Sequence, residues 1–267
     1  MAEDFELLAK EQYGSRKFHQ AIDQGLNKRL TTDILRQKKQ AGGLVSNDAK
    51  ACYDRMVHSI TSICLQRIGV AQEPIICMFT TIQNLEHRVR TIYGDSDISF
   101  TGPLWVVPID GVVNGKMAPI QGIGQGNGGG PAMYAIVSSP VLNMLRGKGH
   151  GVVFLTAMTK EEVRFVAFAF VDDADLFSSS SMKPLATGQD VAEDLQASLD
   201  LWEGGIRTTG GAIEPAKSFW YLIDFVWTNG DWRYATEQDC PASVTVLDAD
   251  GIRQTLRHLA PHQAEQT

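Results

Sequence analysis

The most apolar part of this sequence is the stretch 165–177, which reads FVAFAFVDDADLF and is interrupted near its centre by Asp172 and Asp173. Adjacent side chains on a regular strand point to opposite faces, so neighbouring acids fit a tight hairpin turn better than the interior of a strand. We therefore expect the acids to lie at a turn between two buried strands.

The paired acids Asp172 and Asp173 indicate a site that binds a cation. Two like charges close together in an apolar setting raise each other's pKa unless a cation neutralises them. A divalent metal ion is the natural partner, and ligands that offer only oxygen favour magnesium or manganese over zinc. The alternative is purely structural, because Asp-Asp pairs are common at β-turns, where both residues tolerate turn backbones and hydrogen-bond locally.

A third acid ends a second apolar run, because Leu44-Val45-Ser46-Asn47 leads directly to Asp48. Two antiparallel strands could bring Asp48 to the same sheet edge as Asp172 and Asp173. Three carboxylates from two strands are typical of a two-metal site, which serves phosphoryl or nucleotidyl transfer rather than acid-base chemistry on a carbonyl.

Hydrophobic spacing places helices and strands around these acids. Apolar residues recur at intervals of three and four in the following segments, which we expect to be helical: 11–40, 56–69, 75–89 after Pro74, 131–145, and 191–202 up to Gly204-Gly205. We expect strands at 44–48, 105–107, 152–155, 163–177 and 219–227, with a hairpin turn at Asn229-Gly230. This order predicts an α+β fold in which helices pack on a small antiparallel sheet.

The segment 122–130 is unusually rich in glycine and leads to Pro131. It lacks the Gly-Lys-Ser/Thr ending of a P-loop and the later acid of a dinucleotide-binding turn. Either it is a plain flexible linker, or its backbone approaches a ligand closely, with Gln125 as the central amide and a helix N-terminus beyond it that favours anions.

Composition narrows the class of protein. The chain has 267 residues, enough for one large or two small domains, and its 24 basic and 31 acidic residues give a net charge of -7. This charge argues against binding of phosphate backbone over the whole surface. The four cysteines form no C-x-x-C pair and the histidines are scattered, so we expect reduced, packed cysteines and no histidine-based metal site. An acidic start and the lack of a long apolar run predict an intracellular address, in the nucleus or the cytoplasm, without a membrane span.

Four blocks, taken together, resemble the palm of a reverse transcriptase, and more closely the type found in retrotransposons that lack long terminal repeats. The blocks are 46–55, Gln125-Gly126 with Pro131-Ala132, 170–173 and 211–218, and the upstream segment 11–17 resembles the stretch that precedes the palm. In the first block an acid, Asp48, is followed five positions later by an aromatic residue, Tyr53. Their order and spacing agree with those of the family.

The resemblance implies an RNA-directed DNA polymerase that adds deoxynucleotides to a primer 3′-hydroxyl. In such an enzyme Asp48, Asp172 and Asp173, with the carbonyl of Ala49, bind two magnesium ions, for which manganese could substitute. The residues implied at the nucleotide are Tyr53 under the sugar, where it excludes a 2′-hydroxyl, Gln125 with Gly126 at the sugar and template side, and Lys217 at the triphosphate. The implied partners are an RNA template, a DNA or RNA primer, deoxynucleoside triphosphates and further domains of a larger polyprotein.

The resemblance also implies three parts. Residues 1–43 correspond to a helical segment with part of the fingers, 44–227 to the palm, and 228–267 to a hairpin and tail before a missing primer grip and thumb. Two departures are Gly130, where the family usually has serine, and the additional acid Asp175.

The alternatives are a catalytically inactive palm remnant or nucleic-acid-binding module, an RNA-templated RNA polymerase, and an unrelated magnesium-dependent phosphotransferase. Tyr53 argues against the RNA polymerase, because an aromatic residue at that position fits a DNA product better.

Overall fold

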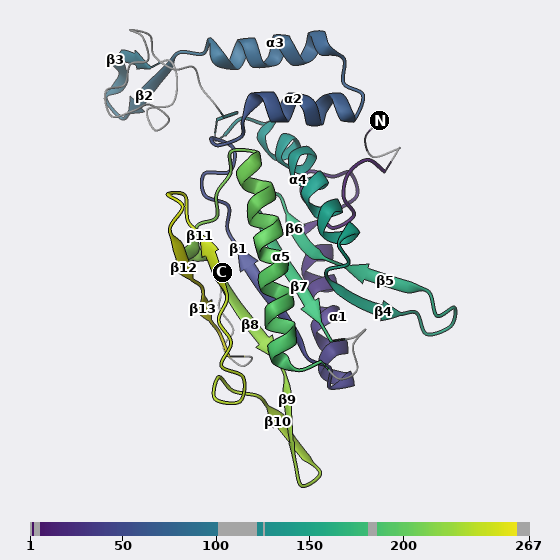
Figure 1. Cartoon of the computed structure of the whole chain (residues 1–267). Helices are drawn as coiled ribbons and strands as arrows, with labels where there is room; N and C mark the ends of the chain where they lie inside the picture. Colours follow the sequence, from purple (N-terminus) through teal and green to yellow (C-terminus); the bar gives the residue numbers. More distant parts are fainter. Residues whose placement is uncertain (1, 3–5, 101–121, 125, 181–185, 261–267) are drawn as a thin grey trace.

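The computed structural model describes residues 2, 6–100, 122–124, 126–180 and 186–260 (Figure 1). The helices are α1 (Ala21–Lys38), α2 (His58–Arg67), α3 (Gln72–Gln83), α4 (Gly130–Gly147), α5 (Gly188–Thr208) and a 3-10 turn at Pro215–Lys217. The strands are β1 (Gly42–Asn47), β2 (His87–Thr91), β3 (Gly94–Phe100), β4 (Val152–Leu155), β5 (Glu162–Phe165), β6 (Ala167–Phe170), β7 (Asp173–Ser179), β8 (Phe219–Ile223), β9 (Phe225–Thr228), β10 (Asp231–Tyr234), β11 (Thr245–Leu247), β12 (Arg253–Thr255) and β13 (Arg257–His258).

The centre of the fold is a five-stranded sheet with the order β13-β8-β1-β7-β6. All neighbours in it are antiparallel except β13 and β8, which run parallel. The remaining strands form two-stranded hairpins or ribbons: β2-β3, β4-β5, β9-β10 and β11-β12. This confirms the predicted α+β class with an antiparallel-rich sheet.

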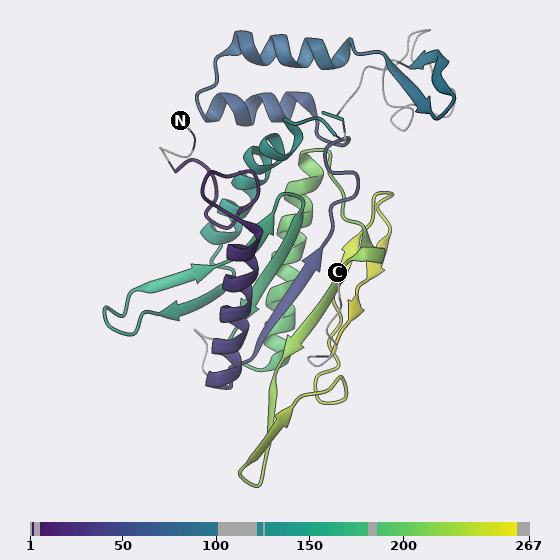
Figure 2. The same cartoon turned by 180° about the vertical axis from the view of Figure 1, so that it is seen from behind.

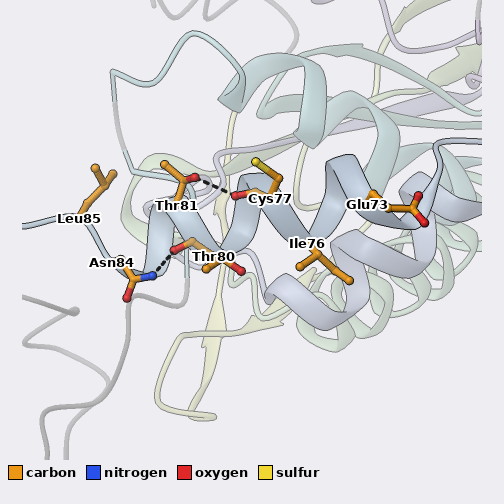
Figure 3. Close-up of a pocket in the computed structure, with 7 residues that line it drawn as sticks. All are labelled: Glu73, Ile76, Cys77, Thr80, Thr81, Asn84 and Leu85. Carbon is orange, nitrogen blue, oxygen red and sulfur yellow. Dashed lines mark hydrogen bonds between the residues drawn. The ribbon is translucent and has the colours of Figure 1, made fainter.

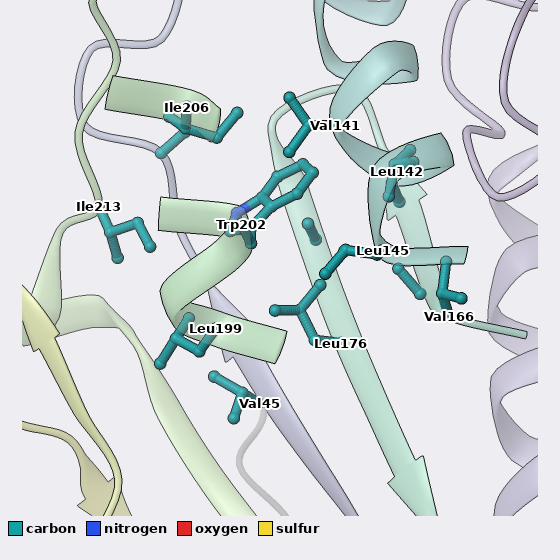
Figure 4. Packing of buried hydrophobic residues seen from close by; sticks show 14 of the residues in the cluster. Val45, Val141, Leu142, Leu145, Val166, Leu176, Leu199, Trp202, Ile206 and Ile213 are labelled. Carbon is teal, nitrogen blue, oxygen red and sulfur yellow. The ribbon is translucent and has the colours of Figure 1, made fainter. Parts of the chain in front are cut away.

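Helices cover both faces of the sheet. The long helix α5 lies across one face with α4 beside it, and α1 lies on the other face (Figures 1 and 2). Figure 4 shows the core on the α5 side, where Trp202 and Leu199 of α5 pack with Val45 of β1 and Leu176 of β7. Burial of such large apolar side chains is the main stabilising contribution to this layer.

A second, smaller apolar cluster lies on the α1 face. Its buried members are Tyr13, Leu35, Leu44, Val152, Phe168 and Phe177. Because Leu44 and Phe177 are paired across β1 and β7, this cluster marks which side chains of those strands point toward α1.

The two ends of the central sheet carry different appendages. Helices α2 and α3, with the β2-β3 ribbon, lie beyond the end at which β1 finishes, whereas the β9-β10 hairpin projects from the opposite end (Figures 1 and 2). None of the helices in the described residues is long and apolar enough to cross a lipid bilayer.

Three predicted helix boundaries were wrong. Helix α3 ends at Gln83, and residues 87–89 belong to β2. Residues 11–20 are not helical, because this part of the chain runs beside β6, where Gln12 bridges Ala169. Helix α5 continues through Gly204-Gly205 to Thr208. A Cβ at Gly205 would lie 2.5 Å from a Val141 methyl carbon, so this glycine permits close packing of α5 on α4 rather than ending the helix.

Other expectations agree more closely. Strand 44–48 appears as β1, Asn229-Gly230 forms the β9-β10 turn, and the stretch 163–177 divides into β5, β6 and β7. The run 219–227 divides into β8 and β9 at Asp224. The strand predicted at 105–107 lies outside the described residues.

Candidate active site

Asp172 and Asp173 lie at the tight turn that joins β6 to β7. Phe170 and Asp173 are paired across the two strands, so Val171 and Asp172 are the two central residues of the turn. Val171 has a φ of 57°, a left-handed conformation that is unfavourable for a β-branched residue. The expectation that the acids lie at a turn is confirmed, and the turn holds a strained backbone.

The buried side chain of Gln12 holds this turn. Its Oε1 accepts a hydrogen bond from the N–H of Val171 at 2.9 Å, and its Nε2 donates to the carbonyl of Val171 at 3.1 Å. The same Oε1 accepts from the N–H of Gly14 at 3.0 Å, and Nε2 also donates to the hydroxyl of Ser138 at 3.3 Å. One amide therefore satisfies both backbone groups of the strained residue, in a place that is closed to water.

Gly14 allows this close approach. A Cβ built on Gly14 would lie 2.4 Å from the backbone nitrogen of Val171, closer than any side chain can come. The segment that carries Gln12 can therefore lie against the turn only because residue 14 has no side chain.

The register of the sheet brings Asp48 to the same edge as the turn. Asn47 of β1 is paired with Ala174 of β7, so Asp48 and Asp173 are the next residues outward on their strands. Side chains alternate along both strands, and Leu44 and Phe177 point toward α1. The same alternation places Asp48 and Asp173 on the α1 face, as a shared site requires.

The charges of these acids influence one another. The pKa of Asp173 is raised above its ordinary value, first by burial and then by the negative charges of Asp172, Asp48 and Asp175, while Lys28 acts in the opposite sense. Carboxylates that are grouped in this way raise one another's pKa by mutual repulsion.

The predicted basic residue also reaches the site. The Nζ of Lys217 lies 3.5 Å from Oδ2 of Asp48, and the Lys217 side chain is 70% exposed whereas that of Asp48 is 26% exposed. Lys217 belongs to the 3-10 turn that follows Glu214. An exposed ion pair of this kind is weak and easily exchanged for another partner.

The chain around Lys217 is joined to the chain around Asp48 by backbone hydrogen bonds. The N–H of Glu214 donates to the carbonyl of Asp48 at 2.9 Å, and the N–H of Lys50 donates to the carbonyl of Ala212 at 2.9 Å. Ala49 forms a bridge with Ile213 between these two bonds. The first and fourth sequence blocks therefore form one continuous edge.

Asp172 has a hydrogen-bond donor that the sequence did not indicate. The Sγ of Cys52 lies 3.5 Å from Oδ2 of Asp172. Burial, followed by the charge of Asp172, raises the pKa of the Cys52 thiol. The thiol therefore stays protonated and donates a hydrogen bond to the carboxylate. Cys52 is buried, as expected of a packed cysteine, whereas Cys77 is exposed, contrary to that expectation. Cys52 also orients a predicted site residue.

Tyr53 stands beside these acids. Burial first, and then the interactions with Cys52 and with the negative charge of Asp172, raise the pKa of Tyr53 to about 12, so the phenol is neutral at physiological pH. Its ring meets Tyr134 edge to face, with the centroids 6.4 Å apart. A Cβ on Gly130 would lie 3.2 Å from the Tyr53 ring, so glycine at this position, where the sequence departs from the family, allows the ring to lie close to the start of α4.

The glycine-rich loop is joined to this part of the site at its beginning. The N–H of Ile123 donates to the carbonyl of Tyr53 at 2.9 Å, and a Cβ on Gly122 would clash with the backbone of Asp54 at 2.3 Å. Gly126 is exposed and has a φ of 89°. Gln125 lies outside the described residues, so its predicted contact with the nucleotide stays a prediction.

No three His, Cys, Asp or Glu side chains within the described ranges are gathered into a ready-made cage for a metal ion. Asp48 is turned to Lys217 and Asp172 to Cys52. The donor set nevertheless fits a hard divalent cation, because three carboxylates share one edge and their mutual repulsion favours a positive charge there.

Comparison with known protein families shows which family this chain belongs to. Residues 1–246 match the family described as Reverse transcriptase (RNA-dependent DNA polymerase). The chain belongs to this family. The kind of enzyme to which it is related is therefore a nucleotidyltransferase that copies RNA into DNA.

Among solved structures, the chain is similar to telomerases from Candida species. Apo telomerase from Candida tropicalis, truncated from its C-terminal domain, is 12% identical with a TM-score of 0.49, over 92% of this chain and 41% of that one. Telomerase from Candida tropicalis with a TWJ fragment of telomeric RNA is 14% identical with a TM-score of 0.47, over 80% and 30%. Telomerase from Candida albicans with a TWJ fragment of telomeric RNA is 12% identical with a TM-score of 0.40, over 89% and 34%. This chain thus spans less than half the length of these structures. Comparison with curated proteins finds no significant match.

A second surface feature lies apart from the acidic edge formed by Asp48, Asp172 and Asp173. Figure 3 shows a depression along α3 that is lined by Glu73, Ile76, Cys77, Thr80, Thr81, Asn84 and Leu85. The Thr81 hydroxyl and the Asn84 amide already donate to carbonyls of this helix, at 2.8 Å each. None of the predicted site residues lines this depression.

Sequence reasoning missed two residues of the site, Gln12 and Cys52. Both lie inside segments that resemble the family, 11–17 and 46–55, so the signal was present. What the sequence could not supply was the contact, because 159 positions separate Gln12 from Val171 and 120 separate Cys52 from Asp172.

Proposed function

We propose that this chain is the palm-centred part of a retroelement reverse transcriptase of the type without long terminal repeats. In this proposal residues 1–43 lead into a palm at 44–227, and residues 228–267 lead toward further parts of a larger polyprotein. The substrates are an RNA template, a DNA or RNA primer and deoxynucleoside triphosphates.

Asp48, Asp172 and Asp173, with the carbonyl of Ala49, would hold two magnesium ions, or manganese in their place. Bound there, such ions activate a primer 3′-hydroxyl and neutralise the charge of a leaving pyrophosphate. The chain's own residues position these groups: Gln12 fixes the turn, Cys52 orients Asp172, and Lys217 can leave Asp48 to meet a triphosphate.

Tyr53 is the residue that we propose selects the sugar. Its ring lies beside the acids and is held between Tyr134 and the bare backbone of Gly130. A ring in this position would meet a 2′-hydroxyl, which favours deoxynucleotides. We expect Tyr53→Ala to raise the incorporation of ribonucleotides relative to deoxynucleotides, whereas an unchanged ratio would remove this role.

The observation that carries the proposal is the pairing of Asn47 with Ala174, which puts Asp48, directly after β1, and Asp173, the first residue of β7, on one edge and one face. The raised pKa of Asp173 supports it, because Asp172 and Asp48 are both among its causes.

Primer extension on an RNA template, with magnesium and deoxynucleotides, tests the proposal. The variant is Asp172→Ala with Asp173→Ala, and the matched control is Asp200→Asn, which removes a half-exposed acid of α5 that faces Arg253. A second readout is the rise in unfolding midpoint on adding magnesium. We expect the double variant to lose both extension and the magnesium effect, and the control to keep them. Equal extension by wild type and double variant would overturn the proposal.

The second candidate is a palm that binds metal and nucleic acid without turnover. It is favoured by the arrangement in which Asp48 pairs with Lys217 and no ready-made cage exists in the described residues. It predicts a magnesium effect that depends on Asp172 and Asp173, together with no extension by any form of the chain.

A further inference from the structure

The β9-β10 hairpin presents an aromatic face at the end of the sheet remote from the acids. Trp227 is paired with Trp232, and Phe225 with Tyr234, so all four rings project from the same face of the hairpin. Phe225, Trp232 and Tyr234 pack against one another, with ring centroids 5.4–5.6 Å apart. Trp227 is 58% exposed and makes no ring contact among the described residues.

A lysine is held against this face by an unusual backbone. Lys39 follows α1 with a φ of 52°, in the left-handed conformation that usually selects glycine at a helix end. Its ammonium lies 3.4 Å from the ring centroid of Trp232 and 5.2 Å from that of Phe225. The helix end alone would be better served by glycine, so the side chain at this position contributes something else.

The positive charge on the aromatic face is not matched by acids of the same hairpin face. Lys38 is exposed next to Lys39. Asp231 alternates onto the opposite face of the hairpin, with Arg233. Asp239 is engaged by Arg233, at 2.7 Å for each of two hydrogen bonds. The Lys38 ammonium lies 5.8 Å from the centroid of the Phe154 ring, so Lys39 is the ammonium that the structure places on the aromatic face. A ring that is free to stack, beside an ammonium group, is a combination that binds single-stranded nucleic acid.

We propose that this aromatic face binds single-stranded RNA, with a base stacked on Trp227 and the adjacent phosphate near Lys39. The choice of RNA rests on the proposed function, because the reaction consumes a single-stranded RNA template. The face lies at the Gly42 end of β1, and six residues of strand separate it from Asp48, which is about 20 Å. It is therefore a contact outside the site of nucleotide addition.

The local charge of this face favours RNA over a second copy of the same protein as the occupant. The chain as a whole carries a net charge of -7, which opposes the approach of a second copy, whereas the aromatic face presents the ammonium of Lys39. A polyanion is attracted to this region, and its affinity falls as salt rises.

Fluorescence anisotropy with a fluorescein-labelled 20-nucleotide oligouridine RNA tests the proposal on the full chain. We expect Trp227→Ala with Trp232→Ala to weaken binding by about 10-fold or more, and Trp227→Phe to keep most of it, since a phenyl ring still stacks. Lys39→Gly should weaken binding by about threefold and reduce its salt dependence, while leaving the helix end intact.

Two controls show whether binding belongs to this surface. Thr228→Ala changes the opposite face of the hairpin, and Tyr93→Ala removes another exposed aromatic residue, from the β2-β3 ribbon. Both should bind RNA as the wild type does. Equal binding by wild type and the double tryptophan variant, or a tryptophan-dependent dimer in light scattering without RNA binding, would overturn the proposal.

Failure of the proposed polymerase function would give a different experimental result from failure of RNA binding at the aromatic face. Asp172→Asn should leave oligouridine binding unchanged, because the acids lie at the other end of the sheet. RNA binding that depends on Trp227 and persists in a chain without extension activity would support the aromatic face and contradict the polymerase.

Discussion

Two hairpins of this molecule are joined by two-residue turns that are stabilised by different means. In the β9-β10 turn, Asn229 and Gly230 have φ values of 54° and 91°, which both residue types adopt readily. In the β6-β7 turn, Val171 takes a φ of 57° although valine strongly disfavours it. The difference is that Gln12 and Gly14 hold the second turn from outside, whereas the first turn is favoured by its own residues.

Of the two turns, the strained one is the turn that carries Asp172 and Asp173. The relaxed turn joins the strands of an exposed hairpin, and the strained turn presents Asp172 and Asp173. A turn that other elements hold is fixed in position, and fixed position is what a carboxylate site for nucleotidyl transfer requires.

Removal of the Gln12 amide, which holds the β6-β7 turn, should have the largest effect on stability. Gln12→Leu leaves the N–H and carbonyl of Val171 and the N–H of Gly14 without their partner in a buried place. We expect a loss of about 3 kcal/mol in the free energy of unfolding, measured by urea denaturation. A Leu variant as stable as the wild type would show that the turn holds itself.

A side chain added at Gly14, where the chain lies against Val171, should have the second largest effect on stability. A side chain at Gly14 must displace the Val171 backbone, so we expect Gly14→Ala to lower the free energy of unfolding by about 2 kcal/mol. The matched control is Gly25→Ala in α1, where a Cβ meets nothing within 4 Å. This change should stabilise the protein by up to about 1 kcal/mol. The same sign for both alanines in thermal unfolding would contradict the argument.

An exchange of residues between the two turns tests the comparison directly. Asn229→Val should cost about 1–2 kcal/mol, because nothing in the described structure holds that turn from outside. Val171→Asn should change stability by less than about 1 kcal/mol, since relief of strain offsets the loss of apolar packing. Both changes can be measured as shifts of the urea midpoint. Equal costs at the two positions would remove the distinction.

The smallest expected effect is electrostatic. Because the pKa of Asp173 is raised in the folded protein, its ionisation opposes folding, and Asp173→Asn should be more stable than the wild type at pH 7. The difference should shrink as the pH falls through the raised pKa, and vanish below the ordinary aspartate value of about 4. Unfolding curves between pH 3 and 8 would show this. A difference that does not depend on pH would point to packing instead of charge.

Local sequence predicted those features that depend on residues near one another. The apolar stretch with its two acids gave a hairpin with the acids at the turn, and Asn229-Gly230 gave the second hairpin. Predictions failed where a distant contact outweighed the local preference. Gly204-Gly205 would end an isolated helix, but the contact of Gly205 with Val141 carries α5 past it.

The same distinction holds for the site: local sequence predicted its residues, but not the contacts between distant ones. Asp48, Asp172, Asp173, Tyr53 and Lys217 were named from their blocks, and the structure brings Lys217 to Asp48 and both to one edge. The Cys52 contact and the Gln12 support were not foreseen, since a sequence states which residues are present and not which ones meet.

The sequence by itself determined the class of the fold, the residues of the acidic edge and the reverse transcriptase family, because these depend on residue type, spacing and order. Only the tertiary structure decided how a valine is held in a left-handed turn and which lysine covers the aromatic hairpin. Both depend on side chains brought together from distant parts of the chain, where buried hydrogen bonds and close packing outweigh what each residue prefers alone.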